Sequence, residues 1–308
     1  MTKISVVGHQ NPDTDCTLSA IIMCEYLWHK WYSATPYILW WLNKETEYLL
    51  EKYDIDCPKQ TEELDTDIQV CLVDHNESSQ SVKNFSDLNV TWLVDHHKMK
   101  FETESPLYIR VEPICSTASV LYKMFRESSI EISQKTAILM LACIMSDSLM
   151  WKSPTTAEED KKITRELQKI AWVQTLEDFA MPMFEAKSDL WDMPVNDLIQ
   201  YDYKIFEFGA KRVGIGSLET TNPSYGLGRK QEILVWFESL KQSQNLDMII
   251  LCVVDIINEK NTTIVSDWSD AEHLSNIFDV PVNNNLANLW NRVSRKKQIA
   301  NEFAVYFK

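Results

Sequence analysis

Three short apolar segments of the chain each stop at a cluster of aspartate and histidine, and this repeated pattern restricts the possible folds more than any other feature. The segments cover residues 4–7, 68–73 and 90–94. Their length and their β-branched and aliphatic residues predict buried strands. The carboxyl ends of parallel strands meet at one edge of an open α/β sheet, where such sheets bind ligands. The pattern therefore predicts an α/β fold with a parallel sheet at which distant motifs converge.

The first segment runs directly into a histidine and two aspartates, in the sequence Gly8-His9-Gln10-Asn11-Pro12-Asp13-Thr14-Asp15. Asp13 and Asp15 lie two residues apart, so in extended backbone both side chains point the same way. Two carboxylates so close resist joint ionisation unless a cation lies between them, which favours a metal site. Aspartate is also a favoured N-cap residue, so Asp13 and Asp15 could equally cap a helix that begins near Cys16.

The other two segments end in Asp74-His75-Asn76 and Asp95-His96-His97. Four of the six histidines therefore lie beside aspartates at predicted strand ends, which favours a metal site over scattered structural histidines. The apolar helix predicted for residues 133–150 carries one aspartate near its end, Asp147. In such surroundings an aspartate must be paired, hydrogen-bonded or metal-bound, because a lone buried charge is costly.

The mixture of imidazole and carboxylate in these motifs indicates the class of metal. Such ligands, without recurring thiolates, favour Mn²⁺, Co²⁺, Fe²⁺ or Mg²⁺ in near-octahedral sites over a structural zinc site. The candidate ligands are also too many for one ion that keeps open positions. They favour two metals about 3.5–4 Å apart that share bridging carboxylates and activate a water.

The net charge of the chain limits the classes of partner that it can bind. A formal net charge of -15 argues against nucleic acid or an anionic membrane as the main partner. A small anionic substrate would then need metal cations or a local basic patch. The densest basic run is Arg295-Lys296-Lys297, which fits either a solvated helix face or a phosphate clamp. Lys204, at the start of a predicted strand, could bind phosphate in the same way.

Cysteine usage and hydropathy predict a cytoplasmic protein. The seven cysteines include no C-x-x-C pair and are typical of reduced core thiols. The first residues pass straight into a predicted strand, which leaves no room for a signal peptide. The longest apolar runs, such as residues 137–145 and 248–254, fall short of membrane-spanning length.

A length of 308 residues favours about two domains. The sequence predicts a first domain at residues 1–188, a linker at 189–194 that contains Asp189, Asp192 and Pro194, and a second domain at 195–308. Further strands are predicted in the first domain at residues 37–41 and 108–113, and further helices at 46–53, 116–128, 155–172 and 175–187. The second domain has predicted strands at 204–208, 212–218, 248–257 and 262–268 and predicted helices at 230–243 and 271–279.

Taken together, the motifs resemble those of one known family. They are the runs at residues 9–15, 74–76, 95–97, 146–148, 152–155 and 294–298. In this order and spacing they resemble the manganese-dependent family II inorganic pyrophosphatases of the DHH phosphoesterase superfamily. The resemblance spans residues 1 to about 300. The Ser-Arg-Lys-Lys-Gln run separates this family from DHH nucleases, whose second domain carries a Gly-rich motif.

The resemblance implies an N-terminal DHH domain with a parallel sheet and flanking helices, a smaller α/β DHHA2 domain, and an active site between them. It implies two Mn²⁺ per subunit, with Co²⁺ as a possible substitute, held by His9, Asp13, Asp15, Asp74, His96 and Asp147. Asp74 and Asp147 would bridge the metals and His97 would protonate the leaving phosphate. Pyrophosphate, accompanied by Mg²⁺, would be bound by Lys204, Arg295, Lys296 and His97. Relatives of this type are commonly homodimers through the first domain.

Two rival functions stay open. Another DHH phosphoesterase would act on short polyphosphate or a nucleotide phosphate, and a non-catalytic relative would bind metal and phosphate without turnover. The second rival is motivated by the low glycine content, 6 residues in 308. Trp40, Lys44, Cys115 and Trp172 occupy positions where the resembled family commonly has glycine. If such a position needs a positive φ, a bulky residue costs about 1–3 kcal/mol.

Overall fold

The computed structural model describes residues 1–190 and 192–308. Contacts divide the chain into two compact units, Met1–Ala186 and Lys187–Lys308, and each is described here by itself. The predicted linker includes Trp191, which lies outside the described residues, and the predicted boundaries stay a prediction. In the described part of the chain, no helix is long and apolar enough to cross a membrane.

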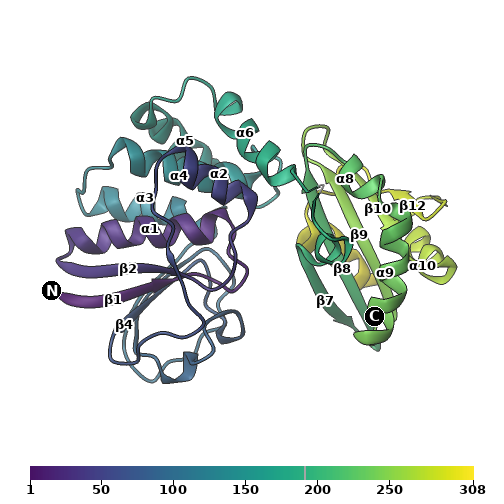
Figure 1. Cartoon of the computed structure of the whole chain (residues 1–308), viewed down its shortest axis with the longest axis horizontal. Helices are drawn as coiled ribbons and strands as arrows, with labels where there is room; N and C mark the ends of the chain where they lie inside the picture. The colour runs from purple at the N-terminus through teal and green to yellow at the C-terminus, as the bar shows by residue number, and fades with distance from the viewer. Residues whose placement is uncertain (191) are drawn as a thin grey trace. The chain divides into compact units, whose positions relative to one another are not determined.

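The first unit contains a six-stranded parallel sheet with the strand order β3-β2-β1-β4-β5-β6 (Figure 1). Its strands are β1 (Thr2–Val7), β2 (Tyr32–Ile38), β3 (Lys59–Gln60), β4 (Gln69–Val73), β5 (Val90–Asp95) and β6 (Tyr108–Val111). The three strands that precede the motifs, β1, β4 and β5, are neighbours. Val7 pairs with Leu72, and Val73 pairs with Val94, so the three carboxyl ends lie level. The predicted parallel sheet is confirmed, and its topology brings the motifs to one edge.

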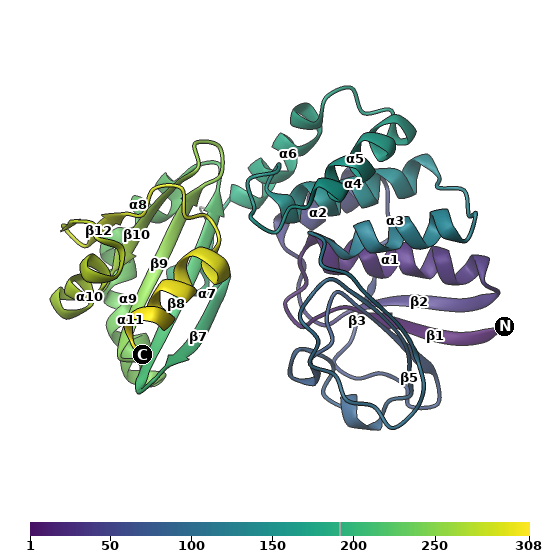
Figure 2. The ribbon, with the colours of Figure 1, turned by 180° about the vertical axis from the view of Figure 1, so that it is seen from behind.

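Helices form two layers over this sheet. They are α1 (Thr14–His29), α2 (Lys44–Lys52), α3 (Thr117–Glu127), α4 (Gln134–Ser148), α5 (Glu158–Ala171) and α6 (Leu176–Ser188). Helices α1 and α3 contact the strands, and α4 contacts α1, α3 and α5 (Figures 1 and 2). Because α4 lies between other helices, its sequence is apolar almost all round, and only its last turn carries the motif with Asp147.

Two elements predicted for the first unit differ from the structure by three residues or more at one end or both. The second strand covers Tyr32–Ile38 rather than residues 37–41, because the apolar run that suggested it continues into exposed side chains: Trp40 is 57% and Trp41 72% exposed. No α-helix joins β4 to β5; the connection contains two short 3-10 helices, η1 (Ser78–Gln80) and η2 (Phe85–Asp87). The helix predicted from residue 155 begins at Glu158, where the Asp160 side chain accepts the backbone N–H of Ala157.

Of the four bulky residues at expected glycine positions, one adopts the backbone conformation that favours glycine. Trp172 ends α5 with φ 57°, whereas Trp40, Lys44 and Cys115 are not among the described residues with positive φ. The left-handed conformation costs a non-glycine residue about 1–2 kcal/mol. The cost at Trp172 is not offset by burial, because its side chain is 79% exposed.

We therefore expect Trp172→Gly to stabilise the protein. Relief of the left-handed strain exceeds the extra flexibility of glycine in the unfolded chain, for a net gain of about 0.5–1 kcal/mol. Trp268→Gly is the matched control, because Trp268 is equally exposed at 79% but has helical backbone in α10. Urea denaturation should show Trp172→Gly more stable than the parent protein and Trp268→Gly less stable. Destabilisation of similar size in both variants would contradict strain at Trp172.

The second unit contains a mixed sheet with the order β11-β12-β10-β9-β8-β7. Its strands are β7 (Tyr203–Phe208), β8 (Lys211–Thr220), β9 (Met248–Asp255), β10 (Lys260–Val265), β11 (Val282–Asn283) and β12 (Leu286–Asn288). Its helices are α7 (Val195–Gln200), α8 (Ser224–Leu227), α9 (Lys230–Ser243), α10 (Trp268–Phe278), the π-helix η3 (Arg295–Ala300) and α11 (Asn301–Tyr306). Strand β9 is buried along its whole length, and α7 and α9 share its core (Figure 2). The basic run at residues 295–297 forms the start of η3.

Candidate metal centre

The first motif forms a tight turn between β1 and α1. Asp13 is the N-cap of α1, where its Oδ1 accepts the backbone N–H of Cys16 at 2.9 Å. The other oxygen of the same carboxylate, Oδ2, lies 3.5 Å from His9 Nε2. The capping role is thus confirmed for Asp13, and the same side chain still faces the imidazole. The two sequence interpretations do not exclude each other at this residue.

Asp15 lies inside the first turn of α1, and not in the extended backbone that the spacing suggested. Its carboxylate is fully buried and accepts hydrogen bonds from Ser116 Oγ at 2.7 Å and Thr117 N at 2.7 Å. The N-terminus of α3 thus points its N–H groups at this carboxylate, as helix N-termini do toward anions. Burial, together with the charge of Asp74, still raises the pKa of Asp15 to about 7. A nearby cation would relieve this mutual repulsion.

Asp74 follows β4 and lies between two imidazoles. Its Oδ2 is 3.3 Å from His9 Nε2, and its Oδ1 is 3.2 Å from His96 Nε2. Asp74 has φ 60°, so the backbone leaves the extended conformation directly after β4. Thr117 Oγ1 donates to Oδ1 at 2.9 Å. Burial acts to raise the pKa of Asp74, but the hydrogen bonds from His9 and His96 outweigh it and hold that pKa well below its usual range.

His96 presents one ring nitrogen to this cluster and uses the other to fix its orientation. Its Nδ1 lies 2.9 Å from the carbonyl oxygen of Ile114, so Nδ1–H donates there and Nε2 is the nitrogen that faces Asp74. Nε2 also lies 3.9 Å from Asp147 Oδ2, at the end of α4. Burial acts to lower the pKa of His96, but its contact with Asp74 raises that pKa to about 9.

His97 is held by an aspartate to which the sequence analysis assigned no role. Asp95 Oδ1 lies 2.9 Å from His97 Nδ1 and also accepts the backbone N–H of His96 at 2.7 Å. Asp95 is fully buried, whereas the His97 side chain is 46% exposed. The second ring nitrogen of His97 is therefore the one available to a ligand. The Asp-His-His run contained the signal for Asp95, because a carboxylate beside paired histidines commonly orients them.

Three groups of side chains in the described residues could hold a metal ion, each with one ligand atom per residue within 4.8 Å of the others. The groups are His9–Cys16–Asp74, Asp74–His96–His97 and Asp15–His96–Asp147. Asp74 and His96 each belong to two groups, which is the arrangement that neighbouring metal positions require. Cys16 was missed as a candidate because the sequence shows no recurring thiolate.

His75 takes no part in this cluster, although its motif suggested that it might. The side chain is buried, and its Nδ1 lies 3.0 Å from the carbonyl oxygen of Val73. Burial lowers the pKa of His75 to about 4, so it is neutral. Because Asp74 has φ 60°, the extended backbone of β4 ends before His75, and the His75 side chain turns back to the carbonyl oxygen of Val73.

The predicted phosphate-binding residues of the second unit lie at the start of η3 and in β7. Arg295, the first residue of η3, pairs with the Asp202 side chain at 2.7 Å and donates to the Asp202 carbonyl oxygen. Asp202 immediately precedes β7, so the basic run lies beside the strand that carries Lys204. Lys296 and Lys204 are both exposed. The pairing of Arg295 with Asp202 thus brings the start of η3 to the start of β7, the strand that contains Lys204.

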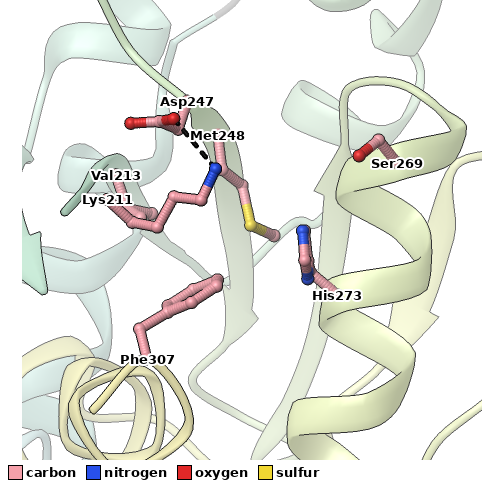
Figure 3. Close-up of a pocket in the computed structure, with 7 residues that line it drawn as sticks. All are labelled: Lys211, Val213, Asp247, Met248, Ser269, His273 and Phe307. Atoms are coloured by element: carbon pink, nitrogen blue, oxygen red, sulfur yellow. Dashed lines mark hydrogen bonds and ion pairs between the residues drawn. The ribbon is translucent and has the colours of Figure 1, made fainter. Parts of the chain in front are cut away.

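The cavity in Figure 3 lies in the second unit and contains none of these residues. Its volume is about 40 Å³, and Lys211, Asp247, His273 and Phe307 are among the residues that line it. Lys211 is paired with Asp247 there at 3.1 Å. A larger cavity of about 210 Å³ in the first unit touches the first motif at Gln10 and Asn11. The candidate metal centre is therefore defined by its ligand set rather than by a cavity.

The chemistry of the donors fits Mn²⁺. Imidazole nitrogen and carboxylate oxygen are ligands that this metal accepts, and the two oxygens of Asp74 face different imidazoles. His96 is oriented as a metal ligand would be, because Nδ1–H donates to a carbonyl oxygen and Nε2, which a metal would bind after losing its proton, faces Asp74. Buried carboxylates so close together are also stabilised by cations. The residues present thus fit a pair of divalent metals.

Comparisons with known proteins agree with this architecture. The DHH family N-terminal domain matches residues 3–144, and the DHHA2 domain matches residues 181–302. The manganese-dependent inorganic pyrophosphatase of Bacillus subtilis is 37% identical over 301 residues, which cover 97% of each chain. A Deinococcus radiodurans protein assigned the same activity is 40% identical over 309 residues, 99% of this chain and 98% of that relative.

A solved structure from Methanococcus jannaschii, assigned to the family II inorganic pyrophosphatases, superposes with a TM-score of 0.82. It is 31% identical and covers 99% of both chains. An exopolyphosphatase-related protein of Bacteroides fragilis, at 14% identity and a TM-score of 0.51, shares the fold alone. The DHH and DHHA2 units define the class of the protein. The chain belongs to the manganese-dependent inorganic pyrophosphatases.

Proposed function

We propose that this chain is an inorganic diphosphatase that hydrolyses pyrophosphate to two phosphates. The observation that carries the proposal is Asp74, whose two carboxylate oxygens face His9 and His96 in a chain that matches named pyrophosphatases along nearly its whole length. Manganese dependence of those relatives supports Mn²⁺ as the cofactor. We further propose that each subunit binds two Mn²⁺, that Co²⁺ can replace them, and that pyrophosphate enters as its Mg²⁺ complex.

The proposed metal ligands are His9, Asp13, Asp15, Asp74, His96 and Asp147. Bound there, the metals would lower the pKa of a shared water and so supply a hydroxide nucleophile at neutral pH. Asp74 and Asp147 would bridge the two positions. Thr117, which donates to Asp74 and to Asp15, keeps these carboxylates in fixed orientation. This orientation is in place before substrate binds, which lowers the reorganisation needed in the transition state.

His97 and the basic residues of the second unit would act on the substrate. Asp95 holds the Nδ1 of His97, so the Nε2 proton is the one that His97 gives to the leaving phosphate. Arg295 has a planar guanidinium that could bind two phosphate oxygens once it exchanges its contacts with Asp202 for the substrate. Lys296 and Lys204 would add point charges against the charge that develops on the phosphates.

The test is phosphate release by protein stripped of metal with a chelator, after Mn²⁺, Co²⁺, Zn²⁺ or Mg²⁺ is added back. We expect no release without metal, rapid release from pyrophosphate with Mn²⁺ or Co²⁺, and little from tripolyphosphate. Comparable release from tripolyphosphate would instead identify a broader DHH phosphoesterase. Tight Mn²⁺ binding with no release from either substrate would identify a non-catalytic relative.

We also propose that the chain forms a homodimer through its first unit and works in the cytoplasm. Strand β6 is at the edge of the first sheet, where Tyr108 is 40% and Ile109 46% exposed. An exposed apolar edge strand is a template for pairing with a second copy. The seven cysteines are free thiols, which supports a reducing compartment. Sedimentation equilibrium with the intact protein measures the oligomeric state.

A further inference from the structure

Glu45 is a buried carboxylate that none of the proposed roles uses. It lies in the first turn of α2, and its side chain is fully buried. Its Oε2 accepts a hydrogen bond from the Thr14 hydroxyl at 2.9 Å and another from the Ser146 hydroxyl at 2.8 Å. Burial of a carboxylate is expensive unless its hydrogen bonds compensate. A buried carboxylate of this kind therefore calls for a specific role.

The two hydroxyls that Glu45 binds are next to proposed metal ligands. Thr14 lies between Asp13 and Asp15 at the start of α1, and Ser146 immediately precedes Asp147 in the last turn of α4. Thr14 and Ser146 are 132 positions apart in the numbering of the chain, and one carboxylate oxygen joins them. The start of α1 and the end of α4 are thereby connected at the level of the metal centre.

Apolar packing alone does not set the distance between these two helix ends. Helices α1 and α4 contact each other through largely apolar faces, and hydrophobic contacts have no preferred direction. Hydrogen bonds to an ionised carboxylate are short and directional. Asn43 supports the connection. Its side chain caps α2 and accepts a hydrogen bond from the Thr46 hydroxyl at 2.9 Å. The Thr46 hydroxyl in turn lies 3.1 Å from the Thr14 hydroxyl.

We propose that Glu45 is a positioning residue of the metal centre. It holds the ligands at the start of α1 and Asp147 at the end of α4 at the separation that two metals need. Glu45 belongs to none of the three groups that could hold a metal, so it acts through Thr14 and Ser146. This inference rests on the proposed function. Metal sites lose activity when ligands move by about 0.5 Å, which is the scale that such a connection controls.

The first variant is Glu45→Gln, which keeps the size of the side chain and removes its negative charge, so the oxygen that both hydroxyls share becomes a weaker acceptor. We expect Mn²⁺ affinity to fall about 10–100-fold, the usual effect of changing a residue that orients metal ligands. Electron paramagnetic resonance of free Mn²⁺ during titration of the metal-free protein measures this affinity. Glu47→Gln is the control, because Glu47 is an exposed carboxylate on the same helix, and its Mn²⁺ affinity should match the parent protein.

A purely structural role would give a different result. If Glu45 only stabilised the fold, Glu45→Gln would lower the unfolding temperature of the metal-free protein and leave Mn²⁺ affinity unchanged, and this would overturn the proposal. At saturating Mn²⁺ we expect a lower kcat with little change in KM for pyrophosphate, because the substrate-binding cations are untouched. A rise in KM with unchanged kcat would contradict positioning of the metal ligands.

A second variant keeps the test decisive if Glu45→Gln folds poorly. Ser146→Ala leaves the carboxylate in place and removes one of its two donors, so it should weaken Mn²⁺ binding several-fold. Combined with Glu45→Gln, its effect should be clearly less than additive, because both changes break one connection. Parent-like Mn²⁺ affinity in Ser146→Ala, or fully additive effects, would overturn the proposal. The titration needs no turnover, so it gives a result even if the parent protein releases no phosphate.

Discussion

Asp74→Asn should abolish phosphate release from pyrophosphate and lower Mn²⁺ affinity more than any other single change in the site. The amide removes the negative charge that faces both His9 and His96. If Asp74 bridges two metals as proposed, its loss removes several kcal/mol of transition-state stabilisation, so we expect a rate at least about 1,000-fold lower. The fold should survive, because asparagine tolerates the positive φ of 60° at this position. Phosphate release and Mn²⁺ titration measure the two effects.

The control for Asp74→Asn is Asp270→Asn in the second unit. Asp270 is also a buried carboxylate, and it pairs with Lys241 at 3.0 Å far from any proposed ligand in the sequence. Its replacement should lower stability while Mn²⁺ affinity and the turnover of the folded protein stay near the parent values. An unchanged rate in Asp74→Asn, or an equal loss of Mn²⁺ binding in Asp270→Asn, would remove Asp74 from the centre of the site.

Lys296→Ala should raise KM for pyrophosphate strongly and leave Mn²⁺ affinity nearly unchanged. Lys296 is exposed at the start of η3, beside Arg295, and a hydrogen bond between charged groups contributes about 1.5–3 kcal/mol. The loss of one such contact corresponds to a rise in KM of about 10–150-fold. Steady-state kinetics at saturating Mn²⁺, together with the Mn²⁺ titration, separates substrate binding from metal binding.

Lys297→Ala is the matched control for Lys296→Ala. Lys297 is the next residue, has the same charge and is also exposed. Because successive helical residues point in different directions, the two side chains cannot make the same contact with one substrate. We expect a much smaller rise in KM for Lys297→Ala. Equal effects in the two variants would indicate a general electrostatic attraction, and weaker Mn²⁺ binding in Lys296→Ala would contradict its assignment to substrate.

The strand ends of the first unit are the part of the fold that the sequence predicted best. The predicted strands at residues 4–7, 68–73 and 90–94 match β1, β4 and β5 to within two residues at each end. These strands are buried on both faces, so their apolar runs are continuous and easily recognised. The second strand was misplaced because Trp40 and Trp41 are apolar and extend the run that suggested a buried strand, but both are exposed. The sequence alone does not show which apolar residues are exposed.

The short elements of the second unit were not predicted from the sequence. Strands β11 and β12 contain two and three residues, and α7 and α11 contain six each. Segments this short do not complete a hydrophobic period, so their structure comes from the sheet and core against which they pack. The basic run was clear in the sequence, but its two interpretations could be weighed only once Arg295 was seen beside Asp202 and β7.

The sequence by itself identified the proposed metal ligands. Aspartates and histidines at the ends of apolar strands can be recognised in the sequence, because strand propensity is local. Parallel strands then bring their carboxyl ends together. Only the tertiary structure decided how these side chains are held. Ser116 and Thr117 bind Asp15 from positions 101 and 102 residues away, and Ser146 binds Glu45 across 101 residues. Hydrogen bonds between such distant residues follow no sequence period, so they arise only when the chain folds.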